Sequence, residues 1–330
     1  GLGGNNSFAG LDIQAGGVLI SSNTALGAGT VTMATGTSLE AAASVTATNN
    51  IVLTGSTTID DHSNTLTLNG VISGAGSTDL NKNGTGTLVL NGANTYAGVT
   101  NLNAGTLSVG NATALSTGAL NMATGTTLQA GGTLTVANAV DLTGSTTVDT
   151  NGNDLTLSGI IGGASATDLN KIGAGILTLT SANTYAGVTN LNVGTINVGN
   201  AAALSGGALN MATGTTLQAG GTFTVANAVD LTGSTTIDTN GNDLTLSGAI
   251  GGTGGFDNSG AGILTLTGSN NYAGATNVNV GTMLVNGTNS GTGLTSVASG
   301  AALGGSGTFS GAVDVAGGAT LFAGQTTGAV

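Results

Sequence analysis

Short runs in which apolar and polar residues alternate extend along the chain, with Gly or Asn-Gly between them. A period of two is the pattern of a β-strand with one buried face, and Gly and Asn-Gly are turn residues. No stretch shows the 3.6-residue period of an amphipathic helix. The pattern predicts an all-β protein of short strands, for example TLVL at 87–90, TLSV at 106–109, TLTV at 133–136, DLTL at 154–157 and ILTL at 176–179.

A repeat of 89 residues organises these runs. The string MATGT begins at Met33, Met122 and Met211, so the spacing is 89 residues both times. The stretch 120–161 is identical to its counterpart 209–250 except for three apolar exchanges, Leu134/Phe223, Val148/Ile237 and Ile160/Ala249. Self-similarity at a long fixed period is the signature of a solenoid, in which each repeat packs on its neighbours.

The spacing of the apolar positions predicts the length of one coil. From Leu88 the next such positions are Leu107, Leu134, Leu155 and Leu177, which gives steps of 19, 27, 21 and 22. Four steps make one repeat, which predicts a β-solenoid with a coil of about 22 residues and two or three short strands per coil. About fifteen coils stacked at the ~4.8 Å strand spacing would form a rod on the order of 70 Å long.

We therefore expect one elongated domain over residues 1–330. The repeat units are expected roughly at 31–119, 120–208 and 209–295. Residues 296–330 are expected to form divergent terminal coils.

Composition fits a stacked coil and excludes other classes. The chain has 62 Gly and lacks Pro and Cys. Gly adopts positive φ at corners without a Cβ penalty, whereas Pro would remove a donor from a strand that is paired on both sides. The Gly residues have no triplet period, which excludes collagen, and a hydrophobic content of 39% is too high for a disordered chain. Without Cys the chain has neither disulfides nor thiolate metal sites.

The charge balance bears on partners. The net charge is −12, with two Lys and no Arg, so the surface cannot neutralise a phosphate backbone and nucleic acid is not an expected partner. No apolar run reaches the ~18 residues of a membrane span. The first residues, GLGGNNSFAG, lack the basic and apolar regions of a signal peptide. We expect either a cytosolic protein or a mature fragment whose targeting parts are missing.

Three segments carry a resemblance to a known family. Residues 173–200 read GAGILTLTSANTYAGVTNLNVGTINVGN, and similar segments begin at Gly84 and, more loosely, at Gly260. They resemble the autotransporter-associated β-strand repeat, also called the passenger-associated transport repeat. Lys82 and Lys171 match the Lys of the family's KxGxGxLxL opening.

The third copy and the ending depart from the family pattern. Asn258 stands where the opening Lys is expected. The stretch from Ala302 resembles a linker that often follows such repeats, but it ends in Phe322-Ala323-Gly324 where the family commonly has Pro-Gly.

The resemblance implies a right-handed parallel β-helix, the passenger domain of a type V secreted protein of Gram-negative bacteria. It implies export across the outer membrane and display or release at the cell surface. A signal peptide and a C-terminal translocator barrel belong to such proteins, and neither is found in this sequence. We therefore expect an excised or processed passenger segment that meets the membrane only through that barrel.

Acidic residues and one imidazole are the candidates for acid/base catalysis. His62 is the only His, and Asn151 and Asn240 stand at its equivalent positions. Paired carboxylates could act as acid and base in a β-helical glycosidase or lyase. Because such pairs recur along the repeats, we favour Asp residues that cap turns through backbone N–H groups. The pairs are Asp60 with Asp61, Asp149 with Asp154, and Asp238 with Asp243.

Three further motifs are weighed and set aside. NGNDLTLSG at Asn151 and Asn240 resembles the GND core of RTX calcium repeats, but copies 89 residues apart cannot stack as those nonapeptides do. Thr-x-Thr pairs, at 178–180 and 265–267, suggest ice binding only if they recur in nearly every coil, and the irregular spacing argues against that. GGTGG at Gly251 has no following Lys and no strand-to-helix pattern, which argues against a phosphate loop.

The three tyrosines, Tyr96, Tyr185 and Tyr272, occur once per repeat. Exposed tyrosines could stack on sugars, whereas corner tyrosines would anchor the packing with the hydroxyl at the edge. The fixed position in the repeat favours the packing role.

These observations predict a non-enzymatic structural or adhesive surface protein. We expect no catalytic residue, cofactor or metal, and the sequence identifies no binding residue, receptor or glycan. One alternative is a self-assembling extracellular fibre that pairs through its end coils. A second alternative is a polysaccharide-active β-helix enzyme.

Overall fold

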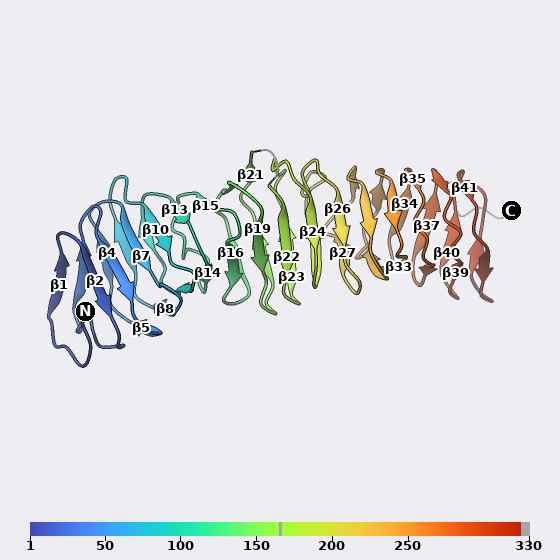
Figure 1. Ribbon diagram of the computed structural model, residues 1–330. Coiled ribbons are helices and arrows are strands. Elements are labelled where there is room, and N and C mark those ends of the chain that lie inside the picture. Colours follow the sequence, from blue (N-terminus) through green and yellow to red (C-terminus); the bar gives the residue numbers. More distant parts are fainter. Residues whose placement is uncertain (165–166, 325–330) are drawn as a thin grey trace. The chain divides into compact units, whose positions relative to one another are not determined.

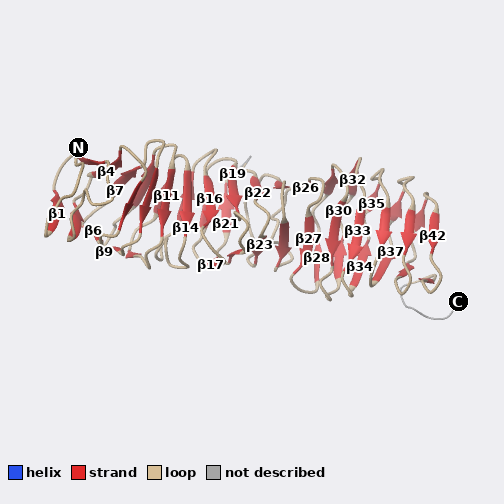
Figure 2. Cartoon of the chain, turned by 90° about the horizontal axis from the view of Figure 1, so that it is seen from below, coloured by secondary structure: helices blue, strands red, loops and turns tan. Residues whose placement is uncertain are grey.

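The computed structural model describes residues 1–164 and 167–324. Within these ranges the chain forms strands and turns and no helix, as Figure 2 shows in red and tan. The chain divides into two units, Gly1–Thr167 and Asp168–Val330, and each is described by itself. Strands of each unit follow one another in hydrogen-bonded series, which we call rows (Figure 1).

The first unit has three long rows and one short row. The β1 row contains β1 (Gly10–Ile13), β3 (Thr30–Met33), β6 (Ile51–Leu53), β9 (Ile72–Gly74) and β12 (Thr95–Tyr96). The β2 row contains β2 (Gly17–Ile20), β4 (Ser38–Ala41), β7 (Thr57–Asp60), β10 (Leu80–Asn83), β13 (Thr100–Leu102), β15 (Leu120–Met122), β18 (Val140–Leu142) and β21 (Ile161–Gly163). The β5 row contains β5 (Val45–Ala47), β8 (Thr65–Leu68), β11 (Thr87–Leu90), β14 (Thr106–Val109), β16 (Thr127–Ala130) and β19 (Thr146–Asp149). The β17 row contains β17 (Leu134–Val136) and β20 (Leu155–Leu157).

The second unit is built in the same way. The β22 row contains β22 (Leu169–Ile172), β24 (Thr189–Leu191), β26 (Leu209–Met211), β29 (Val229–Leu231) and β32 (Ile250–Gly252). The β23 row contains β23 (Ile176–Leu179), β25 (Thr195–Val198), β27 (Thr216–Ala219), β30 (Thr235–Asp238), β33 (Phe256–Ser259), β36 (Thr276–Val278), β39 (Thr295–Val297) and β42 (Val313–Val315). The β28 row contains β28 (Phe223–Val225), β31 (Leu244–Leu246), β34 (Ile263–Leu266), β37 (Thr282–Val285), β40 (Ala302–Gly304) and β43 (Thr320–Leu321), and the β35 row contains β35 (Ser269–Asn270), β38 (Thr288–Asn289) and β41 (Thr308–Phe309).

Consecutive strands of the chain lie in different rows, and the strands of a row pair in parallel. β7, β8 and β9 follow each other in sequence and belong to three rows, so one coil has three sides. Register partners in successive coils are 18 residues apart at Thr295 and Val313 and 23 residues apart at Thr57 and Leu80. The all-β solenoid predicted from the sequence is confirmed, with a coil of about 20 residues instead of 22.

The 27-residue step in the sequence prediction is not a coil. Leu107 pairs with Leu128, which is therefore its counterpart in the next coil. Leu134, the residue chosen from the sequence, lies in another row, where it pairs with Leu155. The prediction counted a step to another side of the coil as a full turn.

The 89-residue repeat is four coils and one further side. In the β2 row the partners that follow Leu39 are Ile59, Lys82, Leu102 and Met122. The repeat equivalent of Leu39 is Leu128, which lies on β16 in the β5 row. In the second unit β22 and its equivalent β33 likewise lie in different rows. Equivalent side chains of successive repeats therefore lie on different sides of the coil, each one side further on than in the repeat before.

The core is a thin column of aliphatic side chains. Alternate residues of most strands are buried, as in the pattern iBiB of β11, β16 and β23. Inward Leu, Ile, Val and Met of successive coils stack, and burial of each such side chain contributes roughly 1.5–3 kcal/mol. The expected repeat boundaries and single domain stay predictions, and residues 325–330 of the expected terminal coils lie outside the described residues.

Candidate functional site

The tyrosines are packing anchors. Tyr96 and Tyr185 are buried, at 0% and 1% exposure, and Tyr272 is 2% exposed. The Tyr96 hydroxyl lies 2.5 Å from the Thr100 hydroxyl, and the other two tyrosines form the same bond four residues along the chain. Burial raises the pKa of Tyr96 and of Tyr185 to about 12. The packing role is confirmed, and burial excludes stacking of these rings on sugars. The hydroxyl groups are buried as well, so the prediction that they lie at the edge is wrong.

A short loop replaces one strand of a coil in the first and in the second repeat. The loop at 110–118 follows β14, while β13 and β14 continue their own rows to β15 and β16. Two buried asparagines close it. Asn94 donates to the Ala114 carbonyl (2.6 Å), and Asn138 donates to the carbonyls of Ser116 (3.1 Å) and Gly118 (2.6 Å).

The same closure recurs at other loops, where Asn183 and Asn227 close 199–207 and Asn6 and Asn49 contact 24–29. These asparagines were not among the residues predicted from the sequence. Their 89-residue spacing, as from Asn138 to Asn227, was the available signal, but buried Asn cannot be told from turn Asn in a sequence.

The recurring aspartates cap turns of the coil by accepting backbone N–H groups. Asp149 Oδ1 accepts the N–H of Asn151 at 2.7 Å, and Asp238 Oδ1 accepts that of Asn240 at 2.8 Å. Both Asn residues have positive φ, 49° and 50°, a conformation that Asn adopts more readily than most residues. The turn-capping role predicted for Asp is confirmed at these positions. Asp243 also accepts a backbone N–H, that of Ile263, at 3.1 Å.

His62 occupies the corner position of those asparagines. Its φ is 53°, and its N–H donates to Asp60 Oδ1 at 2.7 Å. Its Nε2 lies 3.5 Å from Glu40 Oε2, and its side chain is 49% exposed. His62 is thus a solvated corner, as expected. Among the described residues no group of three or more His, Cys, Asp or Glu is placed to hold a metal ion.

Asp61 and Lys82 form a buried ion pair in the first repeat. Lys82 Nζ lies 2.5 Å from Asp61 Oδ2, and both side chains are fully buried. The same Nζ donates to the carbonyls of Asn83, Gly84 and Ala104 at 2.8–3.1 Å. Burial raises the pKa of Asp61 and lowers that of Lys82, against the hydrogen bond and attraction between them. From the sequence Lys82 was a family match and Asp61 a turn cap, and their burial as a pair was not predicted.

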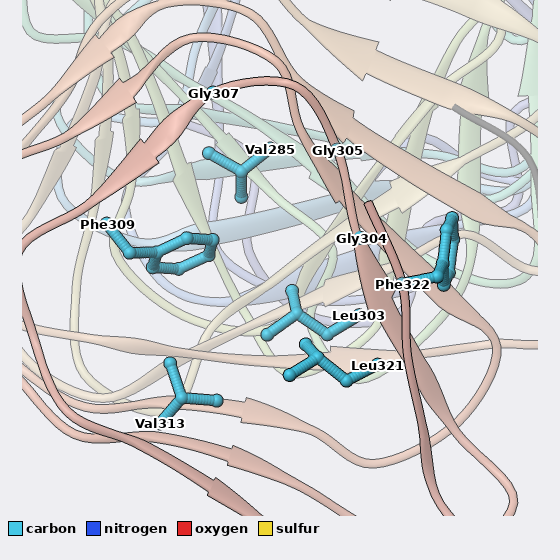
Figure 3. A pocket seen from close by; sticks show the side chains of 9 residues that line it. All are labelled: Val285, Leu303, Gly304, Gly305, Gly307, Phe309, Val313, Leu321 and Phe322. Carbon is cyan, nitrogen blue, oxygen red and sulfur yellow. The ribbon is translucent and has the colours of Figure 1, made fainter. Parts of the chain in front are cut away.

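The pocket in Figure 3 is apolar. It measures about 120 Å³ and is lined by Gly and the side chains of Val285, Leu303, Phe309, Val313, Leu321 and Phe322. None of these side chains carries an acid, base or nucleophile, so the pocket offers no catalytic group.

The remaining motifs are also part of the coil. Gly251 lies within β32, so the GGTGG string begins in a strand and is not a phosphate loop. Thr178 pairs with Asn197, and Thr265 pairs with Thr245 and Leu284. The Thr-x-Thr pattern is therefore not repeated from coil to coil, as the argument against ice binding required.

Comparison with known families identifies the repeats. The family model described as passenger-associated-transport-repeat matches residues 80–109, 169–198 and 259–285. The first match runs from the start of β10 to the end of β14, and the second from β22 to the end of β25. The chain carries three passenger-associated transport repeats, as the resemblance predicted. Comparisons with curated proteins and with solved structures found no match.

The repeats and the β-solenoid fold together fit a secreted passenger domain of an autotransporter. By their family, the repeats imply secretion to the cell surface or the extracellular space. No helix in the part of the chain that the structure describes is long and apolar enough to cross a membrane.

Proposed function

We propose that this chain is the passenger segment of an autotransporter of a Gram-negative bacterium and serves as a non-enzymatic structural or adhesive element outside the cell. The observation that carries the proposal is the presence of three passenger-associated transport repeats whose strands form parts of the coil. A parallel coil can assemble one turn at a time, because each completed turn offers a strand edge to the next.

The use of the polar side chains supports a non-enzymatic role. The tyrosine hydroxyls form hydrogen bonds with Thr hydroxyls, and the buried Asn side chains close loops. Asp149 and Asp238 cap corners by accepting backbone N–H groups. A glycosidase or lyase needs two carboxylates aimed at one bond of a bound sugar. Asp238 is instead used twice within the coil, by the Asn240 N–H and by the Gln218 side chain at 2.9 Å.

Surface location is tested with antibodies raised against the purified chain. We expect them to label intact cells or the culture medium of the source bacterium. Labelling only after the cells are permeabilised would overturn the proposed location.

The adhesive role needs its own experiment. We expect deletion of the segment that encodes residues 1–330 to reduce attachment of the cells to surfaces or to each other, while restoration of the segment recovers it. Unchanged attachment would remove the adhesive role and leave the structural one. Hydrolysis of a glycan by the purified chain would favour an enzyme.

A further inference from the structure

The buried contact between Asp61 and Lys82 joins two successive coils. Asp61 follows the last residue of β7, and Lys82 lies on β10, which pairs with β7. Lys82 points into the core, where its register partners are Ile59 and Leu102. The Nζ atom and the Oδ2 atom, 2.5 Å apart, face each other where no solvent reaches either side chain.

Burial of these two charged groups costs free energy, because transfer from water to an apolar interior disfavours each charged form. The hydrogen-bond pattern of Nζ adds to this. An ammonium has three protons, whereas Nζ has four acceptors here, the carboxylate and three carbonyls. A neutral link between the two side chains would remove both charges and the competition for protons.

We propose that Lys82 and Asp61 condense to an intramolecular amide. Nζ attacks Cγ of Asp61, the C–Oδ2 bond breaks, and two protons of the ammonium leave with Oδ2 as one water molecule. The reaction, –NH3⁺ plus –COO⁻ to –NH–CO– plus H2O, needs no oxidant, reductant or co-reactant. It is independent of the proposed function and ties neighbouring coils of the first repeat together covalently.

The surroundings fit both the intermediate and the product. The Gly86 N–H donates to Asp61 Oδ1 at 2.8 Å, which places a donor on the oxygen that becomes negative when Nζ adds to Cγ. The amide product keeps one N–H, and the Ala104 carbonyl is positioned to accept a hydrogen bond from it. In the third repeat Asn258 places an amide at this position and donates to the matching carbonyl of Val280 at 3.0 Å. Asn83 and Gly84, whose carbonyls lose this donor, are partly exposed residues.

The chain contains its own control. The residue 89 positions after Asp61 is Thr150, whose side chain has no carboxyl group, and the residue 89 positions after Lys82 is Lys171. The two lysines are the only cleavage sites for trypsin, because Arg is absent. An acylated lysine is not cleaved, so the two sites should differ in the denatured protein.

The test is a complete tryptic digest of the purified chain in denaturant, followed by mass spectrometry. We expect cleavage after Lys171 and none after Lys82, which gives residues 1–171 as one fragment that is one water lighter than its sequence. Fragments 1–82 and 83–171 at their unmodified masses would overturn the proposal. Cleavage after Lys171 shows that the digest is complete.

Asp61→Thr, which copies Thr150, should restore cleavage after Lys82 and the full mass of both fragments. The readout is made on denatured protein, so it does not depend on how stable the variant is. An Asp61→Thr chain that still resists cleavage after Lys82 would also overturn the proposal, because Asp61 would not then be the acylating residue.

Discussion

Leu39 and Leu128 occupy the same position of the 89-residue repeat but lie in different rows of the coil. Leu39 pairs with Ile59 in the β2 row, and Leu128 pairs with Leu107 in the β5 row. The loops that replace a strand are displaced in the same way, since they are part of the repeat. At the loop 110–118 the other two rows continue, from β13 to β15 and from β14 to β16. In the first unit the loop at 21–29 lies between strands of the β2 and β1 rows, and the loop at 110–118 lies between strands of the β5 and β2 rows, so the two interruptions fall on different sides of the coil.

The tyrosine anchors should contribute both packing and one hydrogen bond. Tyr185→Phe removes the hydroxyl that contacts Thr189, and we expect a loss of about 1 kcal/mol in the free energy of unfolding. Tyr185→Ala also removes the buried ring, and we expect a loss of about 3–5 kcal/mol. Denaturant unfolding measures both, and Val193→Thr, at a position that is 46% exposed, is the control with a change within about 0.5 kcal/mol. Equal losses for Phe and Ala would contradict the account.

The same burial predicts the alkaline limit of the fold. The folded chain keeps the protons of Tyr96 and Tyr185 up to a pKa of about 12, whereas the unfolded chain releases them near 10. Between these values the folded state binds more protons, so its stability falls as the pH rises from 10 to 12. Tyrosinate absorbance reports this cleanly because the chain has three Tyr and no Trp. Ionisation of all three near pH 10 in the folded protein would show that the rings are exposed.

Position 144 requires glycine because Thr124 of the previous coil approaches it closely. A Cβ atom at this position would lie 1.7 Å from Thr124 Oγ1 and 2.7 Å from Thr124 Cβ. We therefore expect Gly144→Ala to cost about 1–3 kcal/mol, as overpacked sites do. Gly132→Ala is the matched control, because an added Cβ there meets nothing within 4 Å. Thermal unfolding of the two variants decides the point, and similar midpoints would refute the close approach.

Asn138 should protect its loop from local opening. Asn138→Ala leaves the carbonyls of Ser116 and Gly118 without this donor, at a cost of about 1–3 kcal/mol. We expect faster amide hydrogen exchange in residues 111–118 of the variant. The loop 199–207 of the same molecule keeps Asn227 and should exchange as before. Unchanged exchange in 111–118 would mean that the side chain does not close the loop.

The sequence predicts the kind of fold well and its geometry less well. The period-two runs and the MATGT repeat are enough for a β-solenoid, and the aspartate corners follow from turn chemistry. The coil length was overestimated because all three sides carry the same alternating pattern. A step from Leu107 to another side, at Leu134, therefore looks like a step to the next coil, at Leu128.

The buried polar groups were the least predictable part of the candidate site. Asn138 and Asn227 resemble turn residues, and Lys82 resembles a surface charge, because sequence alone does not show which of them the coil encloses. Only the partners of Lys82, one coil before and one coil after, reveal that it stands in an apolar column.

The register of the coil is the central claim, and engineered disulfides test it most directly because the chain has no Cys. A disulfide needs Cα atoms roughly 4.4–6.8 Å apart, which adjacent strands satisfy. Thr106 and Thr127 are register partners, so Thr106→Cys with Thr127→Cys should oxidise readily within one molecule. Thr106→Cys with Thr133→Cys, the pairing implied by a 27-residue coil, should stay reduced. Efficient oxidation of the second pair and not of the first would contradict the 89-residue repeat of four coils and one further side.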